Sequence, residues 1–484
     1  MKAYLRKLFV VMLALGMAQG MVSVGHAQVM PNMMMPNMMM NNMMNNMMMM
    51  NNLAGAGGVI VDADGVLRTQ LSPDPNGQLS RQRIAAARSA LDPKLAKKSP
   101  LRKISLNRLE TAVKSRTDMG MRPTEDMLNM AGMTRIQYVF FYPETNDIVL
   151  AGPAEAYGAD LAGRFRGLDS GQSTLNLDDL VVSLRAFFGE KGREAPLVSV
   201  SIDPTKEGLQ QMQQFLVKMG SRATPNDTEF IVKGLKESLG LQTVRLTGIP
   251  ASSHFAQVLV EADYRMKLLG IGLEAPPANV KMASWAARAN PTAVARNALQ
   301  RWYFVPDYQC VRVAEDELAM ELVGDGVKLI SADEMVNQDG TRTKGGNVDL
   351  ASKGFTTDFT KNYAGIAKGI PVYWQLRNGI DMLVAAAFIK EHKFADKAGW
   401  KMDTFLNEKE YAVETLNVPK QVETAVAAFW KGNRLATPIG GGVHIEPAEA
   451  LKSSNLLDDK AGKVKAKRDE INLNALAKDQ WWWD

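Results

Sequence analysis

One segment of the sequence places a histidine, a carboxylate and a guanidinium where they could act together. A helix predicted after Ser253 would carry His254, Glu261 and Arg265 on one side, and the last two, four residues apart, could form an ion pair. Histidine transfers protons near neutral pH, and this one lies at a strand-to-helix junction, where α/β folds place their sites. These three residues are the candidate catalytic set, and hydrolysis is the chemistry they favour. The alternative is a structural histidine at a helix start.

The other reactive residue types form no recognisable motif. The three histidines that follow the N-terminal leader are far apart in sequence, which gives no zinc-binding pattern: His254, His392 and His444. No G-x-S-x-G elbow, phosphate loop or G-x-G-x-x-G motif is present, and Gly440-Gly441-Gly442 lacks the lysine and serine of a phosphate loop. The single cysteine, Cys310, excludes an intrachain disulfide and is expected to be buried and inert. No cofactor is predicted.

A methionine-rich tract could bind a soft metal. Between Met30 and Asn52 lie 13 of the 30 methionines, and thioether sulfur is a ligand for Cu(I). The candidate ligands are Met33, Met34, Met35, Met38, Met39 and Met40. No histidine or cysteine interrupts the tract to define a site. A disordered low-complexity spacer is therefore the favoured interpretation, with copper binding as the alternative.

A basic stretch gives the sequence its main charge asymmetry. From Arg81 to Arg116 there are eleven basic residues against two acids, Asp92 and Glu110. The pattern predicts a helix over 84–91, a break at Pro93, and a second amphipathic helix carrying Ile104, Leu106, Leu109 and Val113. A docking surface for an anionic envelope component or protein would use Arg81, Arg83, Arg88, Lys97, Lys98, Arg102 and Lys103. The alternative is a solvated helical face balanced by acids elsewhere in the fold.

The N-terminus has the pattern of a secretory signal peptide. Lys2, Arg6 and Lys7 precede an apolar run, and cleavage is expected after Ala27. Loss of the leader lowers the formal net charge from +5 to +2. A nearly neutral chain without aromatic residues among its charges argues against nucleic acid as a partner. We expect a periplasmic or extracellular protein with no membrane span after leader removal. The oligomeric state is not predicted.

The clearest folding unit is a strand, turn and helix over 242–274. Val244 and Leu246 indicate a strand, Ser252 or Ser253 can cap the helix, and glycines at 270 and 272 end it. The apolar stripe that must pack against the core consists of Phe255, Leu259, Ala262, Met266 and Leu269. This unit would position His254.

Strands and helices alternate on both sides of this unit, which predicts a mixed α/β (α+β) fold with two layered domains. A hairpin is expected over 57–69 and a second over 136–151. Strands at 302–305, 310–313, 318–322 and 327–330 are expected to continue one sheet, and a long helix over 373–392 is expected to serve packing rather than chemistry. The predicted organisation is a signal peptide (1–27), a Met/Asn-rich spacer (28–56), a hairpin with the basic helical arm (57–133), an α/β domain (134–275), a linker (276–295), a second α+β domain (296–450) and a charged tail (451–484) that ends in Trp-Trp-Trp-Asp. The three tryptophans could dock a partner or pack back onto the protein.

Three blocks carry a resemblance to a known family. They are YVFFYPETNDIVLAGPAEAY from Tyr138, SSHFAQVLVEADYRMKLLGIGLE from Ser252, and RWYFVPDYQCVRVAEDELAMELVGDGVKLI from Arg301. They resemble a family of exported proteins of unknown function from planctomycete-type bacteria, over about residues 57–450. The resemblance implies export and a shared fold, and it transfers no activity, cofactor or site residue.

The sequence favours a non-enzymatic binding or structural protein of the cell envelope. The scarcity of histidine and the absence of catalytic motifs weigh against an enzyme. A secreted hydrolase with a site near His254 and a methionine-rich copper-binding protein are the alternatives. Convergence of His254 and a carboxylate in a deep pocket would favour the hydrolase.

Overall fold

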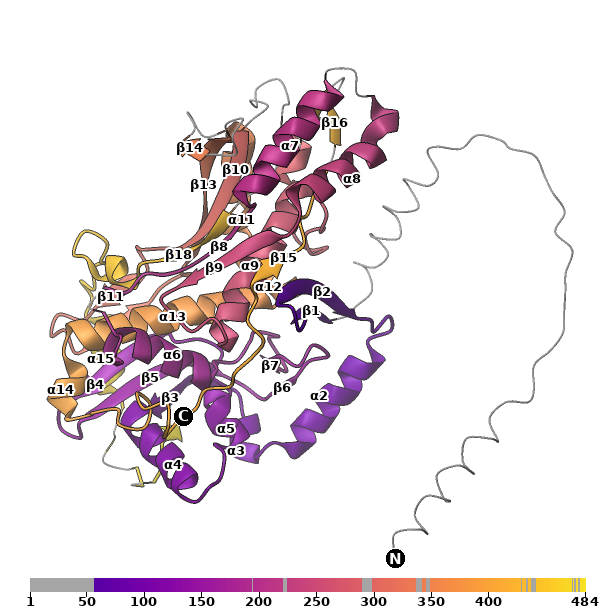
Figure 1. Cartoon of the computed structure of the whole chain (residues 1–484). Helices are drawn as coiled ribbons and strands as arrows, with labels where there is room; N and C mark the ends of the chain where they lie inside the picture. The colour runs from indigo at the N-terminus through magenta and orange to yellow at the C-terminus, as the bar shows by residue number, and fades with distance from the viewer. Residues whose placement is uncertain are drawn as a thin grey trace, which may run out of the picture. The chain divides into compact units, whose positions relative to one another are not determined.

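Two β-sheets with helices packed between and around them make up the protein (Figure 1). The computed structural model describes residues 56–484 except 194, 221–223, 290–297, 337–341, 345–348, 428, 432–433, 437–440, 472, 474–475 and 478. Residues 51–484 form one compact unit. The predicted mixed α/β class is confirmed. The signal peptide, the spacer and the candidate copper ligands lie outside the described residues.

The larger sheet has nine strands and forms the platform for the predicted strand-turn-helix unit. Its order is β1 (Ala56–Val61), β2 (Val66–Ser72), β15 (Gln421–Val422), β9 (Gln242–Thr247), β8 (Val198–Asp203), β18 (Gly441–Ile445), β10 (Ala298–Pro306), β13 (Val327–Val336) and β14 (Arg342–Lys344). β18 runs parallel to β10 and antiparallel to β8. A Cβ atom on Gly441 would lie 2.4 Å from the carbonyl oxygen of Trp302. The lack of a side chain at Gly441 therefore lets strand β18 approach strand β10. It does not serve the approach of a ligand.

The smaller sheet has six strands: β11 (Val311–Val313), β12 (Ala319–Leu322), β4 (Tyr138–Tyr142), β5 (Asp147–Ala154), β3 (Ser99–Ser105) and β19 (Trp482–Trp483). The expectation that 310–313 and 318–322 continue one sheet with 302–305 is wrong, because β12 pairs with β4 instead. Two hairpins stand apart, β6 (Tyr157–Ala159) with β7 (Phe165–Gly167), and β16 (Phe429–Lys431) with β17 (Arg434–Ala436). Both large sheets contain strands from either side of 276–295, and the domain boundaries stay a prediction.

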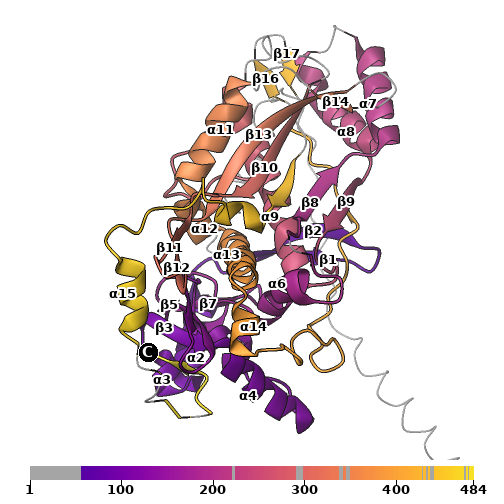
Figure 2. The same cartoon turned by 90° about the vertical axis from the view of Figure 1, so that its left-hand side faces the viewer.

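The longest helix, α13 (Val372–Glu391), lies between the two sheets in both views (Figures 1 and 2). It contacts α6 (Leu177–Phe188) and α9 (His254–Ile271). The other helices are α2 (Gln78–Ala90), α3 (Pro93–Ala96), α4 (Leu106–Asp118), α5 (Glu125–Leu128), α7 (Lys206–Met219), α8 (Thr228–Leu239), α10 (Trp285–Arg288), α11 (Leu350–Lys361), α12 (Tyr363–Gly369), α14 (Phe394–Ala398) and α15 (Lys463–Asp469). No described helix has the length and apolar character needed to cross a membrane.

Helix α9 forms as its sequence predicts. Ser253 caps it by accepting a hydrogen bond from the backbone N–H of Ala256, and Gly272 ends it in a left-handed conformation with φ of 77°. The predicted apolar stripe is buried, from Phe255 at 0% exposure to Leu269 at 1%. Gly248 has φ of 87°, and a Cβ there would lie 2.1 Å from the carbonyl oxygen of Leu197. The turn between β9 and α9 is therefore fixed, and with it the position of His254.

The basic stretch folds differently from its prediction. Its first helix exists as α2, but Ile104 belongs to strand β3 and not to the second helix, which begins at Leu106. Pairing with β5 overrides the helical spacing, and Arg102 and Ile104, two residues apart on this strand, are both buried. The tryptophan tail packs back on the protein, since β19 pairs with β3 and Trp481 and Trp483 are buried.

Candidate functional site

A cleft of about 920 Å³ opens at the N-terminal ends of α6 and α9. Its wall also includes the first turn of α13, the β6–β7 hairpin and the segment 410–415. Helix N-termini carry a partial positive charge that favours carboxylates. Asp178 and Asp179 lie in the first turn of α6, whose cap is Asn176. Two helices that start at the same place thus bring an acidic residue and His254 together.

His254 and Asp179 form a hydrogen-bonded pair on the cleft wall. The distance from His254 Nδ1 to Asp179 Oδ2 is 2.8 Å. Because an ionised carboxylate can only accept, Nδ1 carries the proton and donates. His254 Nε2 lies 3.2 Å from Gln375 Nε2 in α13, and in the neutral ring it accepts from that amide. An imidazole held by a carboxylate at one nitrogen, with a lone pair at the other, is arranged as a general base.

The protonation of His254 reflects two opposing influences. Burial lowers the pKa of the imidazole, and the charge and hydrogen bond of Asp179 outweigh this effect. The result is a pKa above the ordinary value of 6.5. Arg164 opposes the shift and Asp178 adds to it. The Asp179 carboxylate therefore favours the protonated form of His254.

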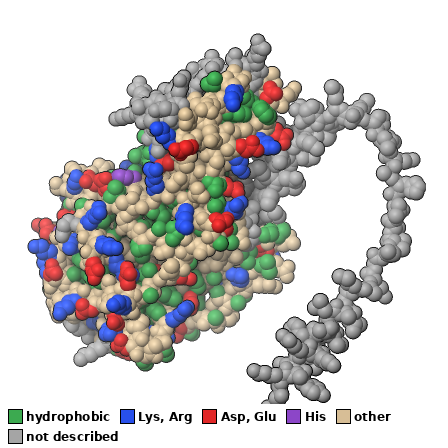
Figure 3. All heavy atoms as spheres, in the orientation of Figure 1, with side chains coloured by type: hydrophobic (Ala, Val, Ile, Leu, Met, Phe, Trp, Pro, Cys, Tyr) green, Lys and Arg blue, Asp and Glu red, His purple; other side chains and the backbone are tan. Residues whose placement is uncertain are grey.

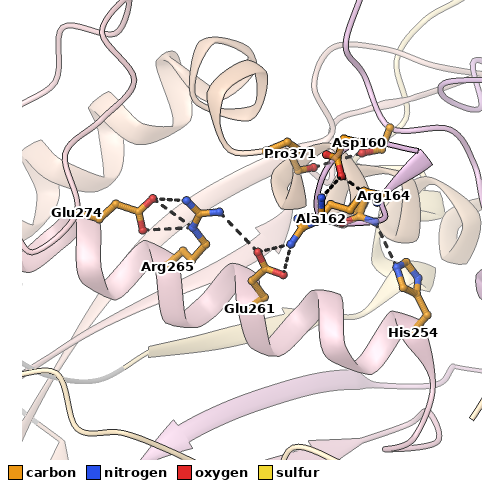
Figure 4. A network of polar contacts seen from close by, with 10 residues as sticks. Asp160, Ala162, Arg164, His254, Glu261, Arg265, Glu274 and Pro371 are labelled. Carbon is orange, nitrogen blue, oxygen red and sulfur yellow. Dashed lines mark hydrogen bonds and ion pairs between the residues drawn. The ribbon is translucent and has the colours of Figure 1, made fainter. Parts of the chain in front are cut away.

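Glu261 is held by two arginines. Arg164 donates to both of its carboxylate oxygens at 2.7 Å, and Arg265 lies 3.6 Å away. Arg265 in turn pairs with Glu274, which gives the chain of charges along α9 in Figure 4. Burial lowers the pKa of Arg265, but the two glutamates raise it above its ordinary value. Arg164 also donates to Gln375 Oε1 at 3.3 Å, which leaves the NH2 group of that amide to face His254.

One oxygen of Asp179 has no partner. The side chain is 9% exposed, and its Oδ1 atom accepts no hydrogen bond from any described residue. A buried carboxylate oxygen normally accepts one, because leaving it unpaired costs about 1–3 kcal/mol or more. Asp179 lines the cleft, but this oxygen is itself buried.

The structure places two of the three candidate catalytic residues in the cleft. His254 and Glu261 line it, whereas Arg265 lies farther along α9 and does not. The sequence reasoning missed Asp179, Arg164 and Gln375. The Asn176-Leu177-Asp178-Asp179 helix start was a visible signal for an acidic N-terminal turn, but nothing local links it to His254. The expectation that the 373–392 helix serves packing alone is wrong at Gln375, although most of its residues are buried.

The basic candidates are scattered, and several already have partners. Arg83 donates to the carbonyl oxygen of Asp160 at 2.7 Å, and Arg88 pairs with Asp169 at 2.5 Å. Arg102 is 0% exposed, which removes it from any docking surface. Acidic and basic side chains are interspersed over the face in Figure 3. A second cleft of about 250 Å³ is lined by Lys97, Lys98, Lys103 and Lys467, while Arg81 stays exposed on α2.

The remaining reactive residues form no site among the described residues. His392 lies 3.7 Å from Glu317 and His444 lies 2.8 Å from Glu446. No group of three or more potential metal ligands occurs in the described part of the chain. Burial raises the pKa of the Cys310 thiol to about 12, so the thiol is protonated at neutral pH, in agreement with an inert cysteine.

Comparison with known proteins finds a local similarity to one protein family and indicates no activity. Neither the curated proteins nor the solved structures gave a match. Residues 200–283 match the model of a family described as "Protein of unknown function (DUF1598)". The matched segment contains His254 and Glu261 but not Asp179, Arg164 or Gln375. The similarity to this family model thus covers the segment that carries the His254 half of the cleft.

Proposed function

We propose that the protein is an exported hydrolase whose reaction takes place beside His254. The observation that carries this proposal is the His254–Asp179 pair on the wall of a cleft large enough for a small molecule. The sequence alone favoured a binding protein because histidine is scarce and no catalytic motif or metal cluster is present. Asp179 supplies that group from a different helix.

In this reaction His254 Nε2 takes a proton from water, and the resulting hydroxide attacks the electrophilic centre of the substrate. The histidine then returns the proton to the leaving group. Asp179 stays ionised, keeps the proton on Nδ1 and stabilises the imidazolium. Water is the nucleophile, because the described hydrogen-bond partners of the ring are Asp179 and Gln375, neither of which is a nucleophilic hydroxyl or thiol. Gln375 occupies the place at Nε2 that the water takes, so its amide must turn aside.

The first test needs no substrate. We expect nitrogen-detected NMR of the ring-labelled protein, recorded at a pH above the pKa of His254 as found by titration, to show His254 protonated at Nδ1 and unprotonated at Nε2. Protonation at Nε2 with a bare Nδ1 would contradict general-base chemistry at the cleft. His444→Gln and His392→Gln assign the other two histidine signals.

The second test is turnover of a panel of chromogenic esters, amides, phosphoesters and glycosides. We expect His254→Gln to lower kcat/KM by about 10²–10⁴-fold, because a positioned general base contributes that much. Asp179→Asn should shift the rise of activity with pH to lower pH, because it removes the charge that raises the pKa of His254. His444→Gln, a histidine outside the cleft, is the matched control. Equal turnover by wild type and His254→Gln would exclude the proposed role.

Export is part of the proposal and rests on the leader pattern. The mature protein should begin at Gln28 and appear in the periplasmic or extracellular fraction. Mass spectrometry of the N-terminal peptide from fractionated cells identifies the first residue of the mature protein and the fraction that contains it. An intact leader in a cytosolic fraction would contradict it.

An envelope binding role for the basic arm is the second candidate. It is favoured by the convergence of Lys97, Lys98 and Lys103 with Lys467 at the second cleft. Anionic envelope components should be captured by the mature protein and lost when the three arm lysines are replaced by glutamine. Replacement of Arg83 and Arg88, which have internal partners, is the control. Identical capture by all variants would exclude docking through this arm.

A further inference from the structure

A chain of polar contacts runs along α9 toward the ring of His254. Glu274 pairs with Arg265, which lies 3.6 Å from Glu261. Glu261 in turn accepts from Arg164 at 2.7 Å (Figure 4). Ionised carboxylates can only accept hydrogen bonds, and guanidinium groups can only donate them. The residue types therefore fix the direction of every hydrogen bond in this chain as far as Arg164.

The turn between β6 and β7 holds Arg164 in place. The Asp160 carboxylate accepts hydrogen bonds from the backbone N–H of Ala162 at 2.9 Å and of Arg164 at 3.0 Å, an arrangement that stabilises tight turns. The side chain of Arg164 is 10% exposed and donates to Glu261 of α9 and to Gln375 of α13. Its guanidinium therefore joins these two helices beside the cleft.

The amide of Gln375 is the member of this chain that carries both a donor and an acceptor. Its Oε1 lies 3.3 Å from Arg164 Nη1, and its Nε2 lies 3.2 Å from His254 Nε2. Because a guanidinium cannot accept, the amide oxygen has to face Arg164, and the NH2 group has to face the ring. His254 Nε2 must then accept, which leaves the ring proton on Nδ1.

Two groups from different helices thus impose the same tautomer on His254. Asp179 of α6 accepts from Nδ1 at 2.8 Å, and Gln375 of α13 donates to Nε2. A water molecule or a substrate hydroxyl also donates to Nε2, so it can replace the amide NH2 group without any movement of the ring proton. Protonation of Nε2, in contrast, would bring two donors together and cost a hydrogen bond.

We propose that Arg164 and Gln375 are positioning residues for His254: Arg164 holds the oxygen of the Gln375 amide, and the amide NH2 group keeps Nε2 of the resting ring unprotonated. Glu261 contributes by holding Arg164. The role of Nε2 as a base rests on the proposed hydrolase function, whereas the control of the tautomer is a property of the resting protein.

The first experiment removes the other group that imposes the tautomer. In Asp179→Ala, nitrogen-detected NMR of the full-length, ring-labelled protein should show the neutral ring of His254 with about a 10-fold excess of the Nδ1-protonated form, the ratio expected for one hydrogen bond. Addition of Gln375→Leu should remove this excess. Gln257→Leu is the matched control, because this amide of α9 donates to the carbonyl oxygen of Asn417 and not to the ring. Equal tautomer ratios with and without Gln375→Leu would overturn the proposal.

A double-mutant cycle separates the contact through Gln375 from the charge of Arg164. The charged groups that act on the ring are Asp179, Asp178 and Arg164. Arg164→Met removes a positive charge and frees the amide to turn its oxygen toward Nε2, and both changes raise the pH at which the ring titrates. In Gln375→Leu only the effect of the charge remains, so the rise should be smaller by about 0.5–1 pH unit.

Arg164→Lys is the conservative variant of this cycle. Lysine keeps a donor and a positive charge, so the ring of His254 should titrate close to its wild-type pH. An equal rise for Arg164→Met with and without Gln375 would show that Arg164 acts on the ring through its charge alone, which would overturn the positioning role of the amide.

The two proposals fail in different ways. Turnover that depends on His254, with tautomer ratios that do not depend on Gln375, would leave the hydrolase standing and exclude the positioning role. Tautomer ratios that depend on Gln375, with turnover that does not depend on His254, would exclude the hydrolase and leave a histidine whose tautomer is set by its neighbours.

Discussion

Two polar clusters of this protein differ in how completely their hydrogen bonds are satisfied. Arg102 is buried under the ring of Trp482, 4.6 Å away, and donates to Asp484 at 2.8 Å and to backbone carbonyl oxygens that include Ala131 at 2.6 Å and Lys97 at 3.0 Å. The side chain of Asp179, buried to a similar degree, has one partner among the described residues, His254, and one oxygen that pairs with none of them. Both are charges removed from water, but the first is paired with protein groups on several sides, and the second faces a cleft.

This difference separates a structural charge from a candidate functional one. Burying a charge is costly unless protein groups replace its hydration. Around Arg102 the protein supplies those groups and ties together β3, α3 and β19. Around Asp179 the replacement is incomplete, because one of its buried oxygens accepts no hydrogen bond from the described residues. Arg102, which lies in a highly basic segment, is therefore a core residue. Asp179, which no sequence motif marked, lies at the candidate site.

The largest effect on stability is expected at Arg102. Arg102→Met should lower the free energy of unfolding by about 3–5 kcal/mol, because it leaves Asp484 and several carbonyl groups without their partner. Urea denaturation followed by circular dichroism measures the change. Arg81→Met, in the same basic stretch but exposed, should change stability by less than about 0.5 kcal/mol. Similar losses of unfolding free energy in the two variants would contradict the distinction between the buried Arg102 and the exposed Arg81.

A smaller effect is expected at the cap that positions His254. Ser253→Ala should cost about 1 kcal/mol, since it removes the acceptor for the N–H of Ala256. Ser253→Asp keeps an acceptor and should recover most of this loss. Thermal denaturation of both variants provides the measurement. Equal destabilisation by both would show that the cap does not determine the start of α9.

The smallest expected effect is the change with pH in the stability that His254 contributes. The pKa of His254 in the folded protein lies above 6.5, so its contribution to stability is fully present below pH 6.5 and is lost as pH rises through the folded-state pKa. Wild type should therefore exceed His254→Gln in stability more at pH 5 than at pH 8.5. The groups that set this shift are Asp179, Asp178 and Arg164.

Urea denaturation at the two pH values gives the difference, with the exposed His444→Gln as the control. An advantage that grows with pH would mean that burial, and not Asp179, dominates the ionisation of His254.

Local patterns determined much of the fold. The capped start of α9, its buried stripe and its glycine end follow from spacing alone, because each depends on residues within one or two turns. The hairpins at 57–69 and 136–151 were predicted correctly for the same reason. Pairings between distant segments were not predictable. The assignment of 311–322 to the smaller sheet depends on Tyr138–Tyr142, more than 150 residues earlier in the chain.

The same distinction between local patterns and contacts of distant segments applies to the candidate site. The sequence by itself determined that His254 stands at the start of a helix and that Glu261 and Arg265 can pair, since both depend on helical geometry. Only the tertiary structure decided that Asp179, Arg164 and Gln375 join His254, because they come from other segments of the chain. It also decided that Arg102 is a core residue, since burial depends on what packs above a strand and not on the strand's own sequence.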